Sequence, residues 1–283
     1  MVQGGNDMQP YFVVSGAVVL FAVLLMIRIR LTRSSGSRTV SGIEIGNGQT
    51  IGSRSEQDDY FSSMTTSVGT LAVVADGISG LANGRMSSTL AVTTFTKAFA
   101  KLEDATNLNG YFAEAATQSN RGILQNLNGQ GGGTTLAAVI VCGYQLYYGA
   151  VGDSLITIYR NGHFQTVNSK HTAETLLEER VLAGQMTSEE AKTSPMRNQL
   201  VNYLGYEGFE SMELGSAPIR LYSGDHVLLC SDGIQEALTE IELEEIMRKG
   251  GTPQETADAM IDAINDKGFK SQDNATVLIL AIG

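Results

Sequence analysis

The chain has 283 residues, a hydrophobic content of 42% and a formal net charge of −11. This length allows one large domain with an appendage, and the hydrophobic content is ample for a packed core. Residues 1–38 carry a balance of +3, so the rest carries −14, which argues against nucleic acid as a partner.

The N-terminal part contains one long apolar segment. Residues 11–27 hold no charge, and an apolar pattern continues to residue 31, so we predict a transmembrane anchor over 11–31 after a short tail at 1–10. Four arginines follow the apolar run between residues 28 and 38, and the positive-inside rule places the tail outside the cell and the rest in the cytoplasm. A buried core helix is the alternative, but the run is apolar on all sides. Residues 32–42 are rich in Ser, Thr, Gly and Arg and predict a flexible linker.

The remaining residues, 43–283, are predicted to form one α+β domain. Apolar and β-branched runs predict strands at 71–75, 136–141, 146–151, 155–159, 164–167, 227–230 and 275–282. Helical spacing predicts helices near 86–103, 111–127, 173–183 and 187–192, and a pair near 240–264. Asn161-Gly162 is typical of a two-residue hairpin turn. Consecutive strands with paired helices indicate packed antiparallel sheets covered by helices.

Two cysteines, Cys142 and Cys230, lie in apolar β-like runs. We expect both to be buried thiols rather than a disulfide, which fits a reducing compartment.

Four short clusters around an aspartate lie at the ends of predicted strands. They are Asp76-Gly77, Gly152-Asp153-Ser154, Ser231-Asp232-Gly233 and Asp273-Asn274. Carboxylates at strand ends can converge on one site although they lie far apart in the sequence. Sites made only of oxygen atoms suit hard cations such as Mg²⁺ or Mn²⁺, whereas the same carboxylates without a cation would repel one another. A lone Asp-Gly is usually only a turn, but the recurrence disfavours that interpretation here.

The order and the residue types of these clusters resemble those of the metal-dependent protein phosphatases, the type 2C Ser/Thr phosphatases. The family pattern runs roughly Arg-x-x-Asn-Glu-Asp, Ala-Asp-Gly-x-Gly-Gly, Gly-Thr-Thr, Gly-Asp-Ser-Arg, Ser-Asp-Gly and Asp-Asn. The matching strings in this chain are Arg54-Ser55-Glu56-Gln57-Asp58-Asp59, Ala75-Asp76-Gly77-Ile78-Ser79-Gly80, Gly133-Thr134-Thr135, Gly152-Asp153-Ser154-Leu155, Ser231-Asp232-Gly233 and Asp273-Asn274. The resemblance covers about residues 50–283, and six short strings in the family order make it specific.

The resemblance implies a four-layer αββα sandwich of two antiparallel sheets flanked by helices, with two Mn²⁺ or Mg²⁺ ions in a cleft at one edge of the sheets. In such a centre Asp76 would bridge both ions, and the carbonyl of Gly77 would be a further ligand. Asp232 and Asp273 would complete the coordination. Asp153 corresponds to a third, weaker metal site, although its Gly-Asp-Ser string could equally be only a turn.

The remaining site residues also come from the resemblance. Arg54 would hold the phosphate oxygens, which suits a guanidinium because it is always charged and binds in a bidentate manner. Asp58 and Asp59 would act beside the metals, Asp59 through metal-bound waters. Residues 181–200 resemble the family's flap, which borders the cleft, and there Arg197 and Asn198 either contact substrate or cap local structure.

Several positions depart from the family pattern without removing a metal ligand. Asp58 replaces Glu, Ser79 replaces Gly, Leu155 replaces Arg, and Lys170 replaces Asp. Ile78 stands where many eukaryotic members have a histidine that acts as general acid, so a metal-bound water would protonate the leaving group. These residue types resemble those of the bacterial members of the family. His163, His171 and His226 are scattered, and none predicts a catalytic base for a Ser or Cys nucleophile.

These observations predict a membrane-anchored enzyme that hydrolyses phosphoserine and phosphothreonine in proteins. A binuclear Mn²⁺ or Mg²⁺ centre would activate a bridging water, and the enzyme would oppose a Ser/Thr kinase at the membrane. One alternative is a phosphatase-like binding or scaffold module without catalysis, which the intact Asp76, Asp232 and Asp273 disfavour. The other is a hydrolase of small phosphoesters, which the sequence leaves open.

Overall fold

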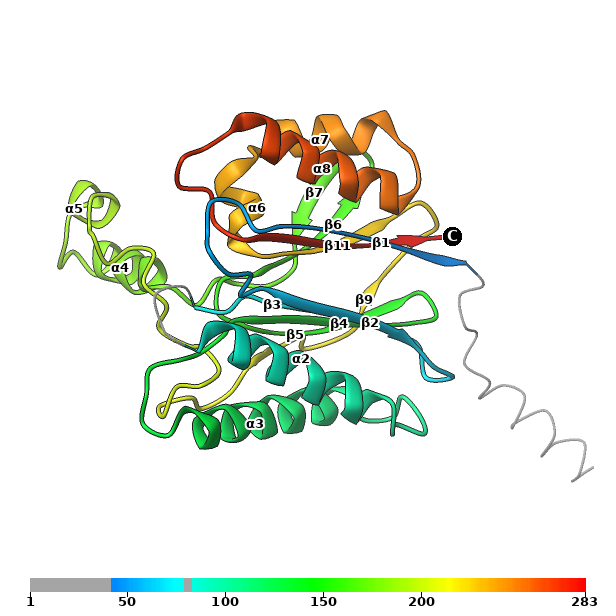
Figure 1. Cartoon of the computed structure of the whole chain (residues 1–283), viewed down its shortest axis with the longest axis horizontal. Helices are drawn as coiled ribbons and strands as arrows, with labels where there is room; N and C mark the ends of the chain where they lie inside the picture. Colours follow the sequence, from blue (N-terminus) through cyan, green and yellow to red (C-terminus); the bar gives the residue numbers. More distant parts are fainter. Residues whose placement is uncertain (1–41, 79–82) are drawn as a thin grey trace, which may run out of the picture. The chain divides into compact units, whose positions relative to one another are not determined.

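The computed structural model describes residues 42–78 and 83–283 (Figure 1). The predicted tail at 1–10, the anchor at 11–31 and nearly all of the linker at 32–42 lie outside these residues. In the part of the chain that the structure describes, no helix combines the length and the apolar character needed to span a bilayer.

The first of two sheets contains both ends of the domain. Its strands lie in the order β1 (Ile43–Thr50), β11 (Ala275–Ile282), β10 (His226–Cys230), β6 (Leu155–Arg160) and β7 (His163–Thr166), and all neighbours are antiparallel. The last strand, β11, therefore lies between β1 and β10. Its register with β1 is complete, from Ile282 opposite Ile43 to Ala275 opposite Thr50.

The second sheet is built from the middle of the chain. Its strands follow the order β2 (Tyr60–Thr65), β3 (Thr70–Ala75), β4 (Leu136–Cys142), β5 (Gln145–Val151) and β8 (Glu213–Leu214), and β9 (Ile219–Arg220) also pairs with β5. All these pairs are antiparallel.

Helices cover the outer face of each sheet (Figure 1). The helices α2 (Gly84–Phe99) and α3 (Leu108–Leu127) pack on the second sheet, and α6 (Asp232–Ala237), α7 (Glu240–Lys249) and α8 (Pro253–Lys267) pack on the first. This order of helix, sheet, sheet and helix confirms the two antiparallel sheets flanked by helices that were predicted.

Residues 71–75 of strand β3 form a continuous apolar run because both faces of this strand are buried. Leu71, Val73 and Ala75 pack against the α2 and α3 side, whereas Ala72 and Val74 pack between the two sheets. Alternate side chains point to opposite faces of a strand, so a strand covered on both faces has no polar face. The carboxylate that follows this strand, Asp76, is thereby placed at the end of a fully buried element.

An aromatic cluster fixes α2 against α3. Phe95 and Tyr111 meet edge to face with ring centroids 5.9 Å apart, and Tyr111 lies 5.3 Å from Phe112 by the same measure. The buried hydroxyl of Tyr111 donates a hydrogen bond of 2.8 Å to the backbone carbonyl of Phe95, so the polar end of the ring is satisfied. These contacts hold the two helices as one layer.

Two short helices lie apart from the four layers, at the left of Figure 1. They are α4 (Ala173–Leu182) and α5 (Ser188–Lys192), within the segment that joins β7 to β8. A capping box of Thr187 and Glu190 starts α5, which explains why the helix begins there. The predicted flap, residues 181–200, begins at the end of α4 and contains α5.

Most predicted elements agree with the structure to within a few residues, and three elements near the site were missed. The predicted hairpin turn is present, with positive φ angles of 55° at Asn161 and 88° at Gly162. The missed elements near the site are β1, β2 and α6, and the two-residue strands β8 and β9 were also missed. Strand β1 was missed because glycine, as at Gly46, is uncommon in strands. A Cβ on Gly46 would lie 2.2 Å from the backbone of Pro253, so the close packing of α8 on this strand requires glycine.

Candidate active site

Side chains from both sheets line one cavity of about 470 Å³. Its lining residues are Asp76, Ile78, Thr135, Asp153, Asn198, Gln199, Leu200, Tyr203, Asp232 and Asp273. Asp76 follows β3, Asp153 follows β5, Asp232 begins α6 directly after β10, and Asp273 precedes β11. The four aspartates named by the sequence clusters therefore meet in one place.

The carboxyl groups in this cavity strongly perturb one another. Burial raises the pKa of Asp76 well above its ordinary value, and the charges of Asp59 and Asp232 raise it further. Burial also raises the pKa of Asp232, with the charge of Asp153 as the next cause. The carboxyl groups of Asp76 and Asp232 interact directly, and burial disfavours the ionised form of both. The pair therefore needs a proton or a cation.

Asp59 lies behind this pair and is only 3% exposed. Its Oδ2 accepts hydrogen bonds from the hydroxyls of Ser231 (2.8 Å) and Thr276 (2.7 Å), but its buried Oδ1 has no hydrogen-bond partner. Burial raises the pKa of Asp59 to about 6, although the two hydroxyls act in the opposite direction. An orphaned carboxylate oxygen beside an acidic cluster is a natural acceptor for a hydrated cation.

Asn274 holds the loop that carries Arg54. Its side-chain nitrogen donates to the backbone carbonyls of Ile51 (2.9 Å) and Glu56 (3.0 Å), and its Oδ1 accepts from the backbone N–H of Asp58 (2.8 Å). Held in this way, the guanidinium of Arg54 donates to the carboxylate of Asp273. The side chain of Arg54 remains 42% exposed, so it can also face a ligand in solvent.

Asp58 and Gly77 form the opposite side of that loop. The carboxylate of Asp58 accepts a hydrogen bond from the backbone N–H of Arg85, and its carbonyl accepts from the N–H of Gly77 at 3.2 Å. A Cβ on Gly77 would lie 2.5 Å from the carbonyl carbon of Gly84 and 2.7 Å from the carbonyl oxygen of Asp58. Glycine is thus required where β3 passes the start of α2.

A separate set of contacts supports Asp153. Gly152 adopts a φ of +92°, and its N–H donates to Nδ1 of His171 at 3.2 Å. The backbone N–H of His171 donates a hydrogen bond of 2.9 Å to the Gly152 carbonyl, and Nε2 of His171 lies 3.6 Å from Oε2 of Glu213. His171 therefore stabilises the turn before Asp153 and is not among the residues that line the cavity.

The two predicted flap residues lie in different places. Asn198 lines the cavity together with Gln199 and Leu200. Arg197 instead donates through Nε to Glu174 at 3.0 Å and lines a second cavity of about 290 Å³ beside α4 and α5. Arg197 therefore holds the flap segment to the start of α4.

Sequence reasoning missed three residues at this site. Thr135 accepts from the backbone N–H of Asp76 (3.1 Å) and shares a hydrogen bond of 2.6 Å with Ser154, although the Gly133-Thr134-Thr135 string was assigned no role at the site. Tyr203 lines the cavity from the flap side and had no sequence signal. Glu236 lies one turn after Asp232 in α6, and the charges of Asp232 and Asp273 help to raise its pKa after burial. The four-residue spacing could have indicated Glu236 once α6 was recognised.

The donor set fits hard divalent cations by its chemistry. It offers carboxylate and carbonyl oxygens, one of them buried without a partner, and it contains two carboxyl groups that cannot both ionise unaided. In residues 42–78 and 83–283, no group of three or more His, Cys, Asp or Glu side chains is arranged to hold an ion as it stands. Binding would therefore replace existing contacts, such as the hydrogen bond from Arg54 to Asp273.

The raised pKa values predict an unusual dependence of stability on pH. Asp59 ionises at about 6 in the folded chain and near 3.8 when unfolded, so the folded state binds more protons between these values. The free energy of unfolding should therefore fall as pH rises through this window, by at most about 3 kcal/mol from this group. Urea titrations in EDTA at pH 4.5 and pH 7.5 would measure the change.

The matched control for this pH effect is Asp59→Asn. This variant should be more stable than the unaltered chain at pH 7.5 in EDTA and should lose less stability as pH rises. Equal pH slopes for both chains would contradict the assignment of the effect to Asp59.

Comparisons with known proteins agree with the geometry. The family model described as "Protein phosphatase 2C" matches residues 46–263. A Listeria innocua relative, "Serine/threonine phosphatase stp", is 31% identical over 219 residues, which cover 74% of this chain and 83% of that protein. The solved S. agalactiae serine/threonine phosphatase has a TM-score of 0.75 at 27% identity and covers 86% of this chain and 100% of its own. The catalytic domain of PstP, solved with two manganese ions, shares the fold with a TM-score of 0.68 at 24% identity over 84% and 97% of the two chains.

Proposed function

This chain belongs to the protein phosphatase 2C family as a serine/threonine phosphatase, and we propose that it works through a binuclear Mn²⁺ or Mg²⁺ centre that activates a bridging water. The observation that carries the proposal is the convergence of Asp76, Asp153, Asp232 and Asp273 from both sheets on one cavity. Its substrates are phosphoserine and phosphothreonine side chains of proteins.

Each carboxylate has a separate task in this proposal. Asp76 would bridge the two ions, with the Gly77 carbonyl as a further ligand, and Asp232 and Asp273 would complete the set. Asp153 would serve a third, weaker site. Asp59 would accept hydrogen bonds from bound water through its orphaned Oδ1. Their buried negative charge makes the cavity attract cations, which in turn allows a phosphate dianion to enter.

Arg54 would hold the phosphate oxygens of the substrate. Its guanidinium already lies at Asp273, on the edge of the cavity, and its exposure leaves donors available. A planar cation that is always charged can bind two phosphate oxygens at once, which orients the phosphorus for in-line attack. Because Arg54 also contacts Asp273, a phosphate held by Arg54 would lie beside the acidic cluster.

The proton for the leaving hydroxyl would come from water in the cavity. Ile78 lines the cavity at the position where a histidine acid would stand, and none of the described histidines lines it. Burial lowers the pKa of His226, and that residue lies in β10 rather than at the cavity. No described histidine is thus placed to protonate the leaving group, which supports water as the acid.

We also propose that the domain is tethered to the membrane. The uncharged run at 11–27 within the predicted anchor at 11–31, followed by four arginines between residues 28 and 38, supports a single anchor with the catalytic domain in the cytoplasm. An enzyme held there would oppose a Ser/Thr kinase that acts at the membrane. The alternative of a scaffold without catalysis is disfavoured because every carboxylate of the expected set is present.

The test is phosphate release from a phosphothreonine peptide by the full chain. We expect release with Mn²⁺ or Mg²⁺ and at least about a hundred-fold less in EDTA, because charge stabilisation of the transition state is the main catalytic term. Restoring Mn²⁺ after EDTA should restore the rate. Equal rates with and without EDTA would exclude the proposed centre, and no release with any metal would favour the binding module.

A further inference from the structure

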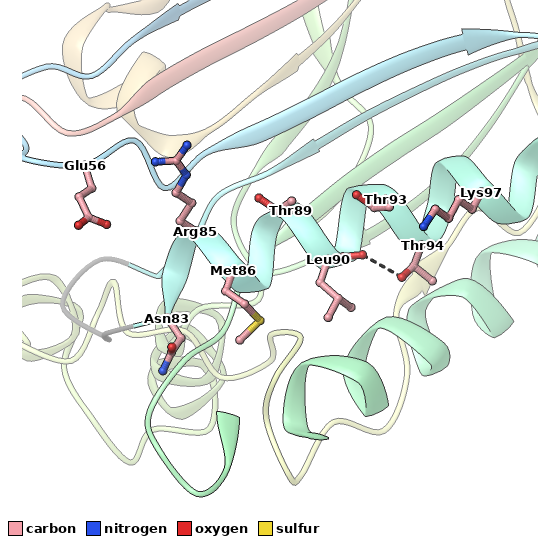
Figure 2. A pocket seen from close by; sticks show the side chains of 9 residues that line it. All are labelled: Glu56, Asn83, Arg85, Met86, Thr89, Leu90, Thr93, Thr94 and Lys97. Atoms are coloured by element: carbon pink, nitrogen blue, oxygen red, sulfur yellow. Dashed lines mark hydrogen bonds between the residues drawn. The ribbon is translucent and has the colours of Figure 1, made fainter. Parts of the chain in front are cut away.

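A groove runs along the exposed side of α2, outside the cavity described above (Figure 2). Its first part has a volume of about 700 Å³ and is lined by Glu56, Asn83, Arg85, Met86, Thr89, Leu90, Thr93, Thr94 and Lys97. A second cavity of about 740 Å³ shares Thr94 and Lys97 with the first and continues to Lys101 and to Glu114 of α3. The two cavities therefore form one path along the helix.

This groove begins beside the loop that carries Arg54 and Asp58, which we call the catalytic loop. The backbone N–H of Arg85 donates to the Asp58 carboxylate, and the hydroxyl of Ser88 donates to the Asp58 carbonyl. Figure 2 shows Glu56 and Arg85 near one end of the row of side chains and Lys97 at the other. A chain that leaves the active site across Asp58 would therefore enter the groove at Arg85.

The groove has a different charge balance from the domain around it. Arg85, Lys97 and Lys101 contribute three cations, and none of them forms an ion pair with another described residue. Two carboxylates, Glu56 and Glu114, line the same path. The groove is thus net positive on a domain with a charge of −14. Cations without partners on an acidic surface favour a ligand that carries carboxylates.

The length and chemistry of the groove fit an extended peptide. Twelve residues of helix separate Arg85 from Lys97, which corresponds to about 18 Å. An extended chain covers this distance with about five or six residues. Thr89 and Thr93 line the groove between the two cations, where their hydroxyls can contact a peptide backbone.

We propose that this groove, which we call the α2 groove, binds an acidic segment of the substrate protein about five to ten residues from the phosphorylated side chain. The inference rests on the proposed function, since it concerns the substrate of the same site. The Arg85 end lies next to the catalytic loop, and Lys97 and Lys101 select for Asp or Glu farther along the peptide. The carboxylates of Glu56 and Glu114 disfavour a continuous polyanion such as nucleic acid.

Two phosphothreonine peptides of equal length test the groove. One carries glutamates five to ten residues to either side of the phosphothreonine, and the other carries glutamines at the same positions. With the full chain and Mn²⁺, we expect kcat/KM to be about ten-fold higher for the glutamate peptide, mainly through KM. Raising the salt to 0.5 M should reduce this preference, since it depends on exposed charges.

The double variant Lys97→Glu/Lys101→Glu should remove or reverse the preference. Arg248→Glu/Lys249→Glu, an equal charge change at two exposed sites on α7, is the matched control and should keep it. The rate on p-nitrophenyl phosphate, which is too small to reach the groove, normalises each variant for an intact centre. Arg85 is left unaltered because its backbone contacts Asp58.

Each result bears on the inference. Equal kcat/KM for the two peptides, or a preference that survives in the double variant, would overturn the α2 groove while the proposed phosphatase function stands. An equal loss on p-nitrophenyl phosphate and on both peptides would also overturn it, because the lysines would then act on the fold. No hydrolysis of any phosphopeptide would overturn both proposals.

Discussion

Replacing Asp232 by Asn is expected to reduce metal-dependent phosphate release by about a thousand-fold or more. The change keeps the size of the side chain but removes a charged oxygen from the centre of the acidic cluster. Asp232 interacts with Asp76 and with the charges of Asp153 and Asp273, so it lies at the centre of the acidic cluster. Initial rates on a phosphothreonine peptide across Mn²⁺ concentrations would measure the loss.

The same variant should be at least as stable as the unaltered chain in EDTA. Burial and neighbouring charges disfavour the ionised form of Asp232, and an asparagine amide can donate to the Asp76 carboxylate. Mn²⁺ should raise the Tm of the unaltered chain and have much less effect on the variant. Asp262→Asn, at an exposed position on α8, serves as the control. A large fall in stability in EDTA would assign the loss of activity to misfolding instead.

Replacing Gly77 by Ala is expected to lower kcat/KM by about a hundred-fold or more and to destabilise the domain by about 2 to 3 kcal/mol. The added Cβ would lie 2.5 to 2.7 Å from backbone atoms of Gly84 and Asp58, and backbone cannot move aside as a side chain can. Either the Asp58 loop or the start of α2 must shift, which displaces Asp58, Asp76 and Gly77 together. Urea titration and steady-state kinetics would measure both effects.

Gly122→Ala is the matched control for Gly77→Ala. Gly122 lies within α3, where a Cβ would meet only the flexible end of the Leu90 side chain at 3.0 Å. Alanine favours helix over glycine by about 1 kcal/mol, so this variant should be as stable as the unaltered chain or more so. If Gly77→Ala matched this control in both stability and rate, the close approach at Gly77 would have no functional role.

Much of the fold could be predicted because its strands are covered on both faces. Runs such as Leu71–Ala75 and Ala275–Ile282 contain no polar face to obscure them, and the turn at Asn161-Gly162 has an unambiguous signal. Strand β1 could not be predicted because its glycines serve the packing of α8, a contact between residues more than 200 positions apart. Helix α6 was missed because it is only six residues long.

The candidate site could also be predicted only in part. The aspartates could be placed because each follows or precedes a strand, and strand ends meet at one edge. The contacts between the loops could not be foreseen. Asn274 holds the Arg54 loop through three hydrogen bonds, and Arg197 bonds with Glu174 rather than lining the cavity. Sequence spacing shows which side chains carry the chemistry, whereas loop contacts decide where each one points.

The position of β11 between β1 and β10 has a consequence for how the enzyme matures during synthesis. The strand that joins β1 to the rest of the first sheet is the last part of the domain to leave the ribosome. Until then β1 has no hydrogen-bonded neighbour in its sheet, and Asp273 and Asn274 have not yet reached the cavity. The second sheet with α2 and α3 can form earlier, because its strands are mostly local in sequence. A nascent chain that still lacks residues 273–282 therefore has an incomplete first sheet and an incomplete cavity, so the site can assemble only after this segment has been made.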